Sequence, residues 1–172
     1  MTLAVEEILP KTVEEACAMI KSVRRKRVAD VTLFDLILNA SGQHRHLHGV
    51  YFVFAAGGGS ILYIGRVQSP QFIERFPAHF ALGAGCWQNQ FLRHHLTATG
   101  ADDFATAAIR ASDCELLLLL SPQCHAAKLE ALLIRLLRPS YNKKQPKAGL
   151  PTVIPPDSTI QFVLDGNVPP IV

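Results

Sequence analysis

Hydrophobic residues recur at helical spacing in some stretches of this chain and form short β-rich runs in others. Two N-terminal stretches begin with a capping signature, a threonine followed three residues later by an acidic residue. Thr12 starts one predicted helix, and Thr32 starts a shorter second helix over 34–38. The N-terminal region is therefore expected to be helical.

Two β-rich runs joined by three consecutive glycines follow within 48–65. This pattern is typical of a β-hairpin. If the loop is centred on Gly57, Tyr51 stands directly opposite Tyr63, with both hydroxyls on one face of the hairpin. The chain has three tyrosines, so this register brings two of them together.

The rest of the pattern predicts helices and one or two further strands. Residues 70–98 have helical spacing, although Pro77 must kink or restart a helix there. A strand is expected at 114–120, after which Ser121 caps a long helix with leucines along one side. Near the C-terminus, 159–164 is expected to add an edge strand; otherwise this region would wrap over the surface.

These elements predict an α+β fold, a small three-stranded antiparallel sheet flanked by helices. We divide the chain into an N-terminal helical extension (1–48), a core (49–142) and a Lys/Pro-rich tail (143–172). With 172 residues, 49% of them hydrophobic, it is long enough for one compact domain. No uninterrupted apolar run approaches the roughly 18 residues of a membrane span, so no membrane association is expected.

The N-terminus and the cysteines favour a cytoplasmic protein. Two glutamates close to the first residue are atypical of a secretory signal. The four cysteines show no paired spacing and are expected to be reduced thiols.

The formal net charge of +3 is spread evenly along the chain and does not itself indicate a nucleic-acid partner. Basic residues do cluster at 21–27, where five of seven side chains are cationic. The cluster is interpreted either as a solvated helix end or as a phosphate contact. Further basic residues lie within the helical region and after position 142. The candidate nucleic-acid contacts are Arg24, Arg25, Lys26, Arg27, Arg93, Lys143 and Lys144.

Polar residues with catalytic potential occur in a specific order along 49–142. The order is Gly49-Val-Tyr51, Tyr63-Ile-Gly65, Arg75, His79, Glu130 and Asn142. Together with the predicted hairpin and the long helix, they resemble the GIY-YIG nuclease family over 94 of the 172 residues. The resemblance implies the three-stranded core described above and an endonuclease activity.

The resemblance also implies a role for each position. The catalytic residues would be Tyr51, Tyr63, Arg75, His79, Glu130 and Asn142, with Arg66 as a further phosphate-binding residue. In this set Arg75 grips the scissile phosphate, Glu130 holds Mg²⁺ or Mn²⁺ and Asn142 closes the site. The chain departs from the pattern at Pro77, which would separate Arg75 from His79 if it breaks the helix.

The residue types suit phosphodiester hydrolysis independently of the family. The reaction needs a proton acceptor for water and positive charge on the phosphate oxygens. A tyrosine accepts a proton near neutral pH only where positive charge favours its phenolate. On a helix, the neighbours of Glu130 three and four positions away are apolar, so its partner is expected to be a metal, solvent or a tertiary arginine.

We therefore expect a metal-dependent endonuclease in which Tyr51 is the preferred general base and Tyr63 helps to position water. The expected substrate is duplex or branched DNA. The high apolar content is explained either by a homodimer interface or by a well-packed N-terminal helical layer. The alternative is a nucleic-acid-binding module of the same fold that has lost catalysis. It would bind DNA in a salt-sensitive way without cutting it.

Overall fold

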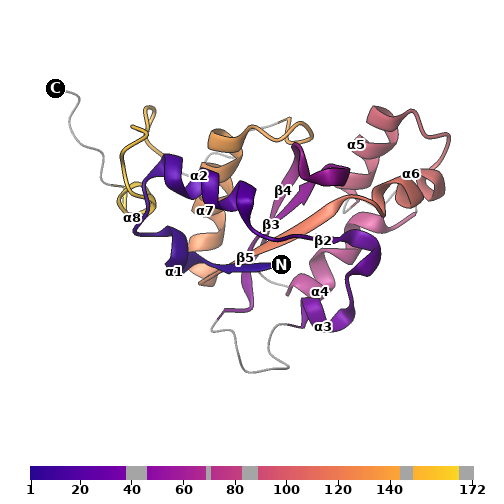
Figure 1. The fold of residues 1–172 in the computed structure, drawn as a ribbon, viewed down its shortest axis with the longest axis horizontal. Coiled ribbons are helices and arrows are strands. Elements are labelled where there is room, and N and C mark those ends of the chain that lie inside the picture. The colour runs from indigo at the N-terminus through magenta and orange to yellow at the C-terminus, as the bar shows by residue number, and fades with distance from the viewer. Residues whose placement is uncertain (38–45, 69–70, 83–88, 144–148, 167–172) are drawn as a thin grey trace.

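A five-stranded mixed sheet forms the centre of the molecule (Figure 1). The computed structural model describes residues 1–37, 46–68, 71–82, 89–143 and 149–166. The strand order is β1-β5-β3-β4, and the short β2 pairs with β5 beside β1. β1 runs parallel to β5, whereas the other pairs are antiparallel. The strands are β1 (Thr2–Ala4), β2 (Lys26–Arg27), β3 (His48–Phe54), β4 (Ile61–Val67) and β5 (Glu115–Ser121).

The α+β class is confirmed, but the predicted number of three strands is wrong. The expected strands are β3, β4 and β5, whereas β1 and β2 come from the segment expected to be helical. They are only three and two residues long, too short to show the alternation by which a strand is recognised. Residues Leu3, Ile8 and Ile20 of this segment are buried in the same core as β3 and β5.

Helices cover both faces of the sheet. Alternate residues of β3 divide between the two cores: Val50 and Phe52 face one side, Tyr51 and Val53 the other. The first face is covered by α1 (Val5–Ile8), α2 (Val13–Ser22), α7 (Gln123–Leu137) and α8 (Ile160–Leu164). The second face is covered by α3 (Leu33–Leu36), α4 (Phe72–Arg75), the 3₁₀ turn η3 (Pro77–Phe80), α5 (Gln90–Thr99) and α6 (Phe104–Ala111). Two further 3₁₀ turns are η1 (Val28–Asp30) and η2 (Ala56–Gly58).

Local signals account for the helix starts. The Thr12 hydroxyl accepts a hydrogen bond from the Glu15 N–H, and the Glu15 carboxylate accepts one from the Thr12 N–H. The predicted cap at Thr32 is likewise present at the start of α3. That helix ends at Leu36, and the end of its predicted span lies outside the described residues.

Two predicted elements are corrected, and the expected restart at Pro77 is confirmed. Ser121 belongs to the end of β5, and Pro122 precedes the first residue of α7. Residues 159–164 form the capped helix α8 instead of a strand, because Ile160, Val163 and Leu164 recur at helical spacing and are buried together. Over 70–98 the described residues form α4, η3 and α5, and Pro77 restarts the chain as a 3₁₀ turn.

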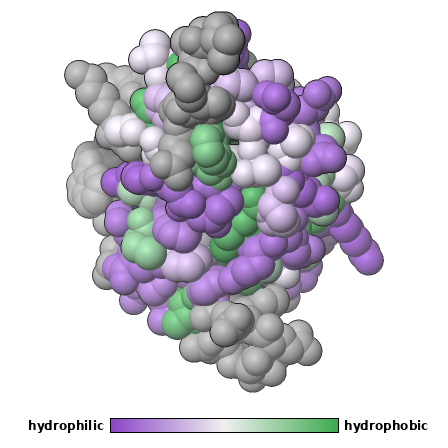
Figure 2. Space-filling model, turned by 90° about the vertical axis from the view of Figure 1, so that its left-hand side faces the viewer, coloured by the Kyte–Doolittle hydropathy of each residue, from purple (hydrophilic) through white to green (hydrophobic). Residues whose placement is uncertain are grey.

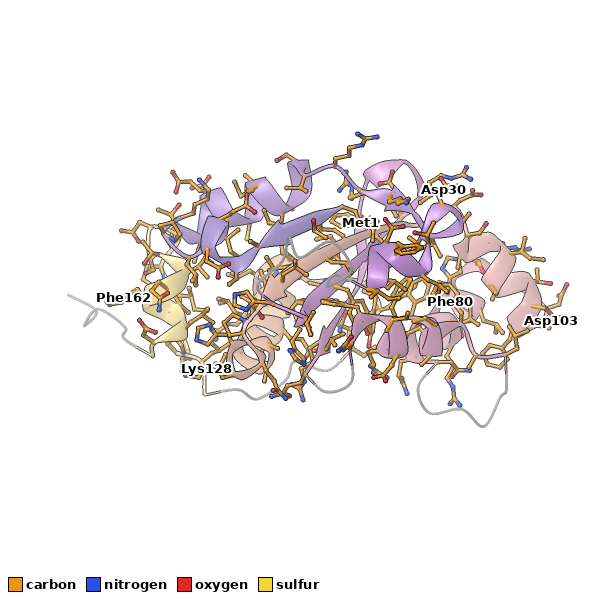
Figure 3. All side chains as sticks on the ribbon, turned by 90° about the horizontal axis from the view of Figure 1, so that it is seen from below. Met1, Asp30, Phe80, Asp103, Lys128 and Phe162 are labelled. Carbon is orange, nitrogen blue, oxygen red and sulfur yellow. The ribbon has the colours of Figure 1, made fainter. Side chains whose placement is uncertain are left out.

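The C-terminal helix packs at the end of the molecule away from α5 and α6. The Lys128 ammonium on α7 donates to the Leu164 carbonyl oxygen of α8 at 3.0 Å. Figure 3 shows Lys128 and Phe162 at one end of the molecule and Phe80 and Asp103 at the other. The surface at the α8 end is mostly hydrophilic, with small hydrophobic areas between polar side chains (Figure 2). In the described part of the chain, no helix combines the length and apolar character needed to cross a bilayer.

Candidate active site

The two tyrosines of the hairpin lie on the same face of the sheet but are not directly opposite one another. Tyr51 pairs with Gly65, and Tyr63 pairs with Val53. The predicted register is therefore wrong by two residues. The pairing shifts by one residue between Val53 and Phe54, and the loop is centred between Gly57 and Gly58 instead of on Gly57. A shift of two preserves the face, so the tyrosine rings still approach, with centroids 6.2 Å apart.

Gly65 leaves room for the Tyr51 ring to extend across β4. A Cβ at position 65 would lie 2.2 Å from the Tyr51 hydroxyl oxygen and 2.4 Å from the ring carbon that carries it. Real side chains do not approach so closely, so only glycine leaves this space. The lack of a side chain at Gly65 therefore makes the observed position of the Tyr51 hydroxyl possible.

His79 forms a hydrogen bond with the hydroxyl of Tyr51. The Tyr51 hydroxyl forms a short hydrogen bond with His79 Nε2, and the Phe91 amide N–H donates to His79 Nδ1 at 3.4 Å. Because an amide N–H only donates, Nδ1 accepts, and Nε2 carries the proton of the neutral ring. His79 therefore donates to the Tyr51 oxygen, which leaves the proton of Tyr51 itself to point elsewhere. The predicted interruption at Pro77 does not remove His79 from the site.

Burial and neighbouring charge set the protonation of this group. Burial, followed by the positive charge of Arg75, lowers the pKa of His79 to about 3. Burial raises the pKa of Tyr51 well above its usual value and also raises that of Tyr63. The two hydroxyls interact, which raises the pKa of Tyr51 and lowers that of Tyr63, while Arg75 lowers both. Of the two phenols, Tyr63 thus more readily becomes a phenolate.

The tyrosines also differ in their access to solvent. Tyr51 is completely buried, whereas Tyr63 is half-buried. Tyr63 borders a pocket of about 370 Å³. A water molecule or a substrate can therefore reach Tyr63, while Tyr51 lies behind it.

Glu130 has a tertiary arginine as its partner. Its carboxylate lies 3.1 Å from the Arg66 guanidinium, with 14% of the Glu130 side chain and 42% of the Arg66 side chain exposed. Burial raises the pKa of Glu130, and Arg66 and Arg75 oppose that rise. The sequence left metal, solvent or a tertiary arginine as the partner of Glu130, and the structure places an arginine there. Arg66, the predicted phosphate ligand, is engaged in this ion pair.

Among the described residues, the candidate metal site consists of the Glu130 carboxylate and not of a cluster of metal ligands. No three His, Cys, Asp or Glu side chains gather in the described chain in a way that could hold a metal ion. Mg²⁺ typically uses one or two carboxylates and takes its other ligands from water and substrate phosphate. Glu130 fits that pattern as a hard oxygen donor at the edge of the site. The predicted metal ligand therefore remains a proposal that depends on Glu130 alone.

Asn142 connects the end of α7 to β4. Its amide oxygen accepts from the Ile64 N–H at 2.9 Å, and its amide nitrogen donates to the Ile64 carbonyl at 2.8 Å. Both bonds reach β4 one residue from Tyr63. Asn142 therefore positions the strand that carries the accessible tyrosine, and it also borders the pocket.

The predicted basic cluster is engaged mainly with acidic neighbours. Arg25 pairs with Glu115 at 3.2 Å and stacks over Phe54. Lys26 pairs with Asp35 at 2.6 Å, and Arg27 pairs with two aspartates. Since α2 ends at Ser22, these charges lie beyond the helix and tie β2 to the sheet. The expectation that they contact DNA gains no support from this arrangement.

The other predicted DNA contacts are placed differently. Arg93 on α5 donates to the Asn89 side chain at 2.8 Å. Lys143 borders the pocket, whereas Lys144 lies outside the described residues. His94, next to Arg93 in a strip of the sequence that could face DNA, lines the pocket together with Gln90 and Tyr141, which no motif indicated. Gln90 and His94 are four residues apart on one helix, a spacing that could have suggested a shared face.

Comparisons with known proteins give no assignment. No family model, curated protein or solved structure matches the chain. The chemistry of the site is therefore inferred from its own residues.

Replacing His79 by glutamine should reduce the acid sensitivity of the fold. Since the pKa of His79 is about 3 against about 6.5 in an unfolded chain, the unfolded state binds an extra proton between these pH values. This proton lowers the stability of the wild type by about 1.4 kcal/mol per pH unit as the pH falls across that window. Above about pH 6.5 the contribution vanishes.

Urea unfolding of the wild type and of His79→Gln at pH 7, 6, 5 and 4 measures this effect. As the pH falls below about 6.5, the free energy of unfolding of the wild type should decrease relative to that of His79→Gln. Parallel pH profiles would show that His79 titrates as in the unfolded chain.

Proposed function

We propose that this protein is a metal-dependent endonuclease that hydrolyses DNA phosphodiester bonds at the β4 edge of its sheet. The observation that carries the proposal is the placement of Tyr63. The Tyr63 side chain is half-buried and lies beside Tyr51 and His79, and the charges of Arg75 and Glu130 act on its hydroxyl in opposite directions. This group can accept a proton from water next to a bound phosphate.

Tyr63, rather than Tyr51, is proposed as the general base. His79 donates to the Tyr51 oxygen, so the Tyr51 hydroxyl is free to donate to Tyr63 and stabilise its phenolate. Arg75 lowers the pKa of the same phenol. Tyr51 is completely buried and acts by positioning and hydrogen bonding. This reverses the roles expected from the sequence.

Positive charge for the phosphate comes from two arginines and the metal. Arg75 already acts electrostatically on both tyrosines. Arg66 is 42% exposed and can exchange part of its pairing with Glu130 for a substrate phosphate. Bound Mg²⁺ or Mn²⁺, held by Glu130, would supply Lewis-acid stabilisation of the developing charge.

Removing the Arg75 guanidinium should lower cleavage by about 100-fold, the usual effect of losing one group that stabilises a developing oxyanion. The assay incubates supercoiled plasmid and labelled oligonucleotides with the wild type, Arg75→Ala or Arg110→Ala, in Mg²⁺ or in EDTA. Arg110 lies on α6, where it donates to the Thr99 carbonyl, so it serves as a control for the loss of an arginine. The wild type and Arg110→Ala should both cut DNA in Mg²⁺ and not in EDTA.

Equal cleavage by Arg75→Ala and wild type would show that the assigned site is wrong. Salt-sensitive DNA binding by the wild type, without cleavage in Mg²⁺ or in Mn²⁺, would instead favour the catalytically inactive binding module.

A further inference from the structure

The pocket beside Tyr63 is formed by two segments that are distant in sequence. Its volume of about 370 Å³ lies within the roughly 300–1,000 Å³ typical of small-molecule sites. Gln90 and His94 of α5 form one wall, and the segment after α7 forms the other. The lining residues are Tyr63, Gln90, His94, Tyr141, Asn142 and Lys143. The proposed catalytic phenol is therefore part of the pocket wall.

The wall after α7 is held in place by contacts behind it. The Tyr141 N–H donates to the Leu62 carbonyl at 2.8 Å, and its hydroxyl lies 3.0 Å from His95 Nδ1. His95 is buried and stacks on Phe91, with ring centroids 5.4 Å apart. A wall fixed in this way needs little ordering when a ligand binds.

Flat rings and a cation distinguish the chemistry of the pocket. The rings of His94 and Tyr141 are 6.0 Å apart and inclined by 37°. Burial and the neighbouring Lys143 lower the pKa of His94, so its ring is neutral at physiological pH. Lys143 supplies positive charge beside these uncharged rings. Aromatic surfaces next to a cation are the elements with which proteins hold an unpaired nucleotide.

We propose that this pocket binds one unpaired nucleotide of the substrate, next to the scissile phosphate, with its base against His94 and Tyr141 and its phosphate towards Lys143. The inference rests on the proposed nuclease function, because Tyr63 joins the pocket to the reacting phosphate. A base within an intact duplex must be unstacked and flipped before it enters such a pocket. DNA with an unpaired nucleotide at the cleavage position is thus the preferred substrate.

Binding of thymidine 5′-monophosphate tests the pocket without any cleavage. Calorimetric titrations in EDTA compare the binding of the nucleotide with that of inorganic phosphate and with that of thymidine, which lacks the phosphate. His94→Ala should weaken nucleotide binding about 5- to 10-fold, as expected for the loss of one stacking partner, and leave the weak binding of phosphate unchanged. Lys143→Ala should weaken binding of the nucleotide more than that of thymidine. Thr97→Ala, on the exposed surface of the same helix, should bind as the wild type does.

Cleavage of matched oligonucleotides tests the substrate preference. One duplex is perfect, and the other carries a single unpaired nucleotide in the same sequence. The wild type should cut the second substrate at least about 10-fold faster, since a nucleotide that is already unpaired enters the pocket without the cost of unpairing and flipping. His94→Ala should lose most of this preference.

The outcomes separate the two proposals. Nucleotide binding no stronger than that of phosphate, or unaffected by His94→Ala, would overturn the pocket assignment. Equal cleavage of both duplexes would overturn the preference for an unpaired nucleotide. Nucleotide binding that depends on His94, with no cleavage of any DNA in Mg²⁺ or Mn²⁺, would overturn the nuclease function and leave the nucleotide pocket in place.

Discussion

Glu130→Gln should abolish metal-dependent DNA cleavage without weakening the fold. Glutamine keeps the shape of the side chain but removes the negative charge proposed to hold the metal, so we expect the cleavage rate to fall at least about 100-fold. Burial raises the pKa of Glu130, which means that its charged form costs folding free energy. Its partner Arg66 is 42% exposed and remains hydrated when the carboxylate is lost.

The sign of the stability change follows from that raised pKa. A group whose pKa is raised by folding contributes stability at low pH, and this contribution is lost as the pH rises through its folded value. At neutral pH, Glu130→Gln should therefore unfold at the same temperature as the wild type or higher. The stability of the wild type relative to this variant should rise as the pH falls from the folded pKa of Glu130 to its unfolded value of about 4.5, and should then stay constant.

Cleavage assays in Mg²⁺ and thermal unfolding at pH 7 and pH 4 measure the two effects on the same samples. Glu14→Gln, at an exposed position of α2, is the matched control for loss of a glutamate and should leave activity unchanged. Full activity in Glu130→Gln would remove the carboxylate from the site. A marked loss of stability at neutral pH would instead give Glu130 a structural role through Arg66.

Local features of the sequence predict local structure well in this protein. The caps at Thr12 and Thr32 are confirmed because each involves residues only three positions apart. The β-hairpin is present because two β-rich apolar runs flank the glycines. Its register is wrong by two residues, because neither the one-residue pairing shift between Val53 and Phe54 nor the exact centre of the loop can be read from the apolar runs. Tyr51 and Tyr63 still share a face, since an even shift preserves the face.

Contacts between segments that are distant in the chain could not be predicted from the sequence. The Arg66–Glu130 pair joins residues 64 positions apart, and Asn142 bonds Ile64 across 78 positions. The apolar neighbours of Glu130 on its helix left its partner open among metal, solvent and arginine. The difference in burial between Tyr51 and Tyr63 likewise depends on packing by η3 and α5, so the sequence favoured the more deeply buried phenol as the base.

Gly65→Ala should both destabilise the protein and remove its activity. The added methyl group would lie 2.2 Å from the Tyr51 hydroxyl oxygen and 2.4 Å from the adjoining ring carbon, so the buried ring or β4 must move. Overpacking of this kind typically costs about 1–3 kcal/mol. Tyr51→Phe keeps the ring carbon and would not relieve the clash. Any displacement also breaks the alignment of Tyr51 with His79, on which the acidity of Tyr63 depends in the proposed mechanism.

Gly59→Ala provides the matched control. At Gly59 a Cβ would meet no atom within 4 Å and the backbone φ is −71°, so alanine fits without strain. Alanine at such a position is expected to be neutral or stabilising by about 0.4–1 kcal/mol, through the unfolded state. Urea unfolding and DNA cleavage at a temperature where all variants are folded separate lost stability from lost chemistry. If Gly65→Ala kept wild-type stability and activity, the Tyr51 ring could move away from position 65 without effect on the fold or the reaction. The proposed support of Tyr63 by Tyr51 would then be wrong.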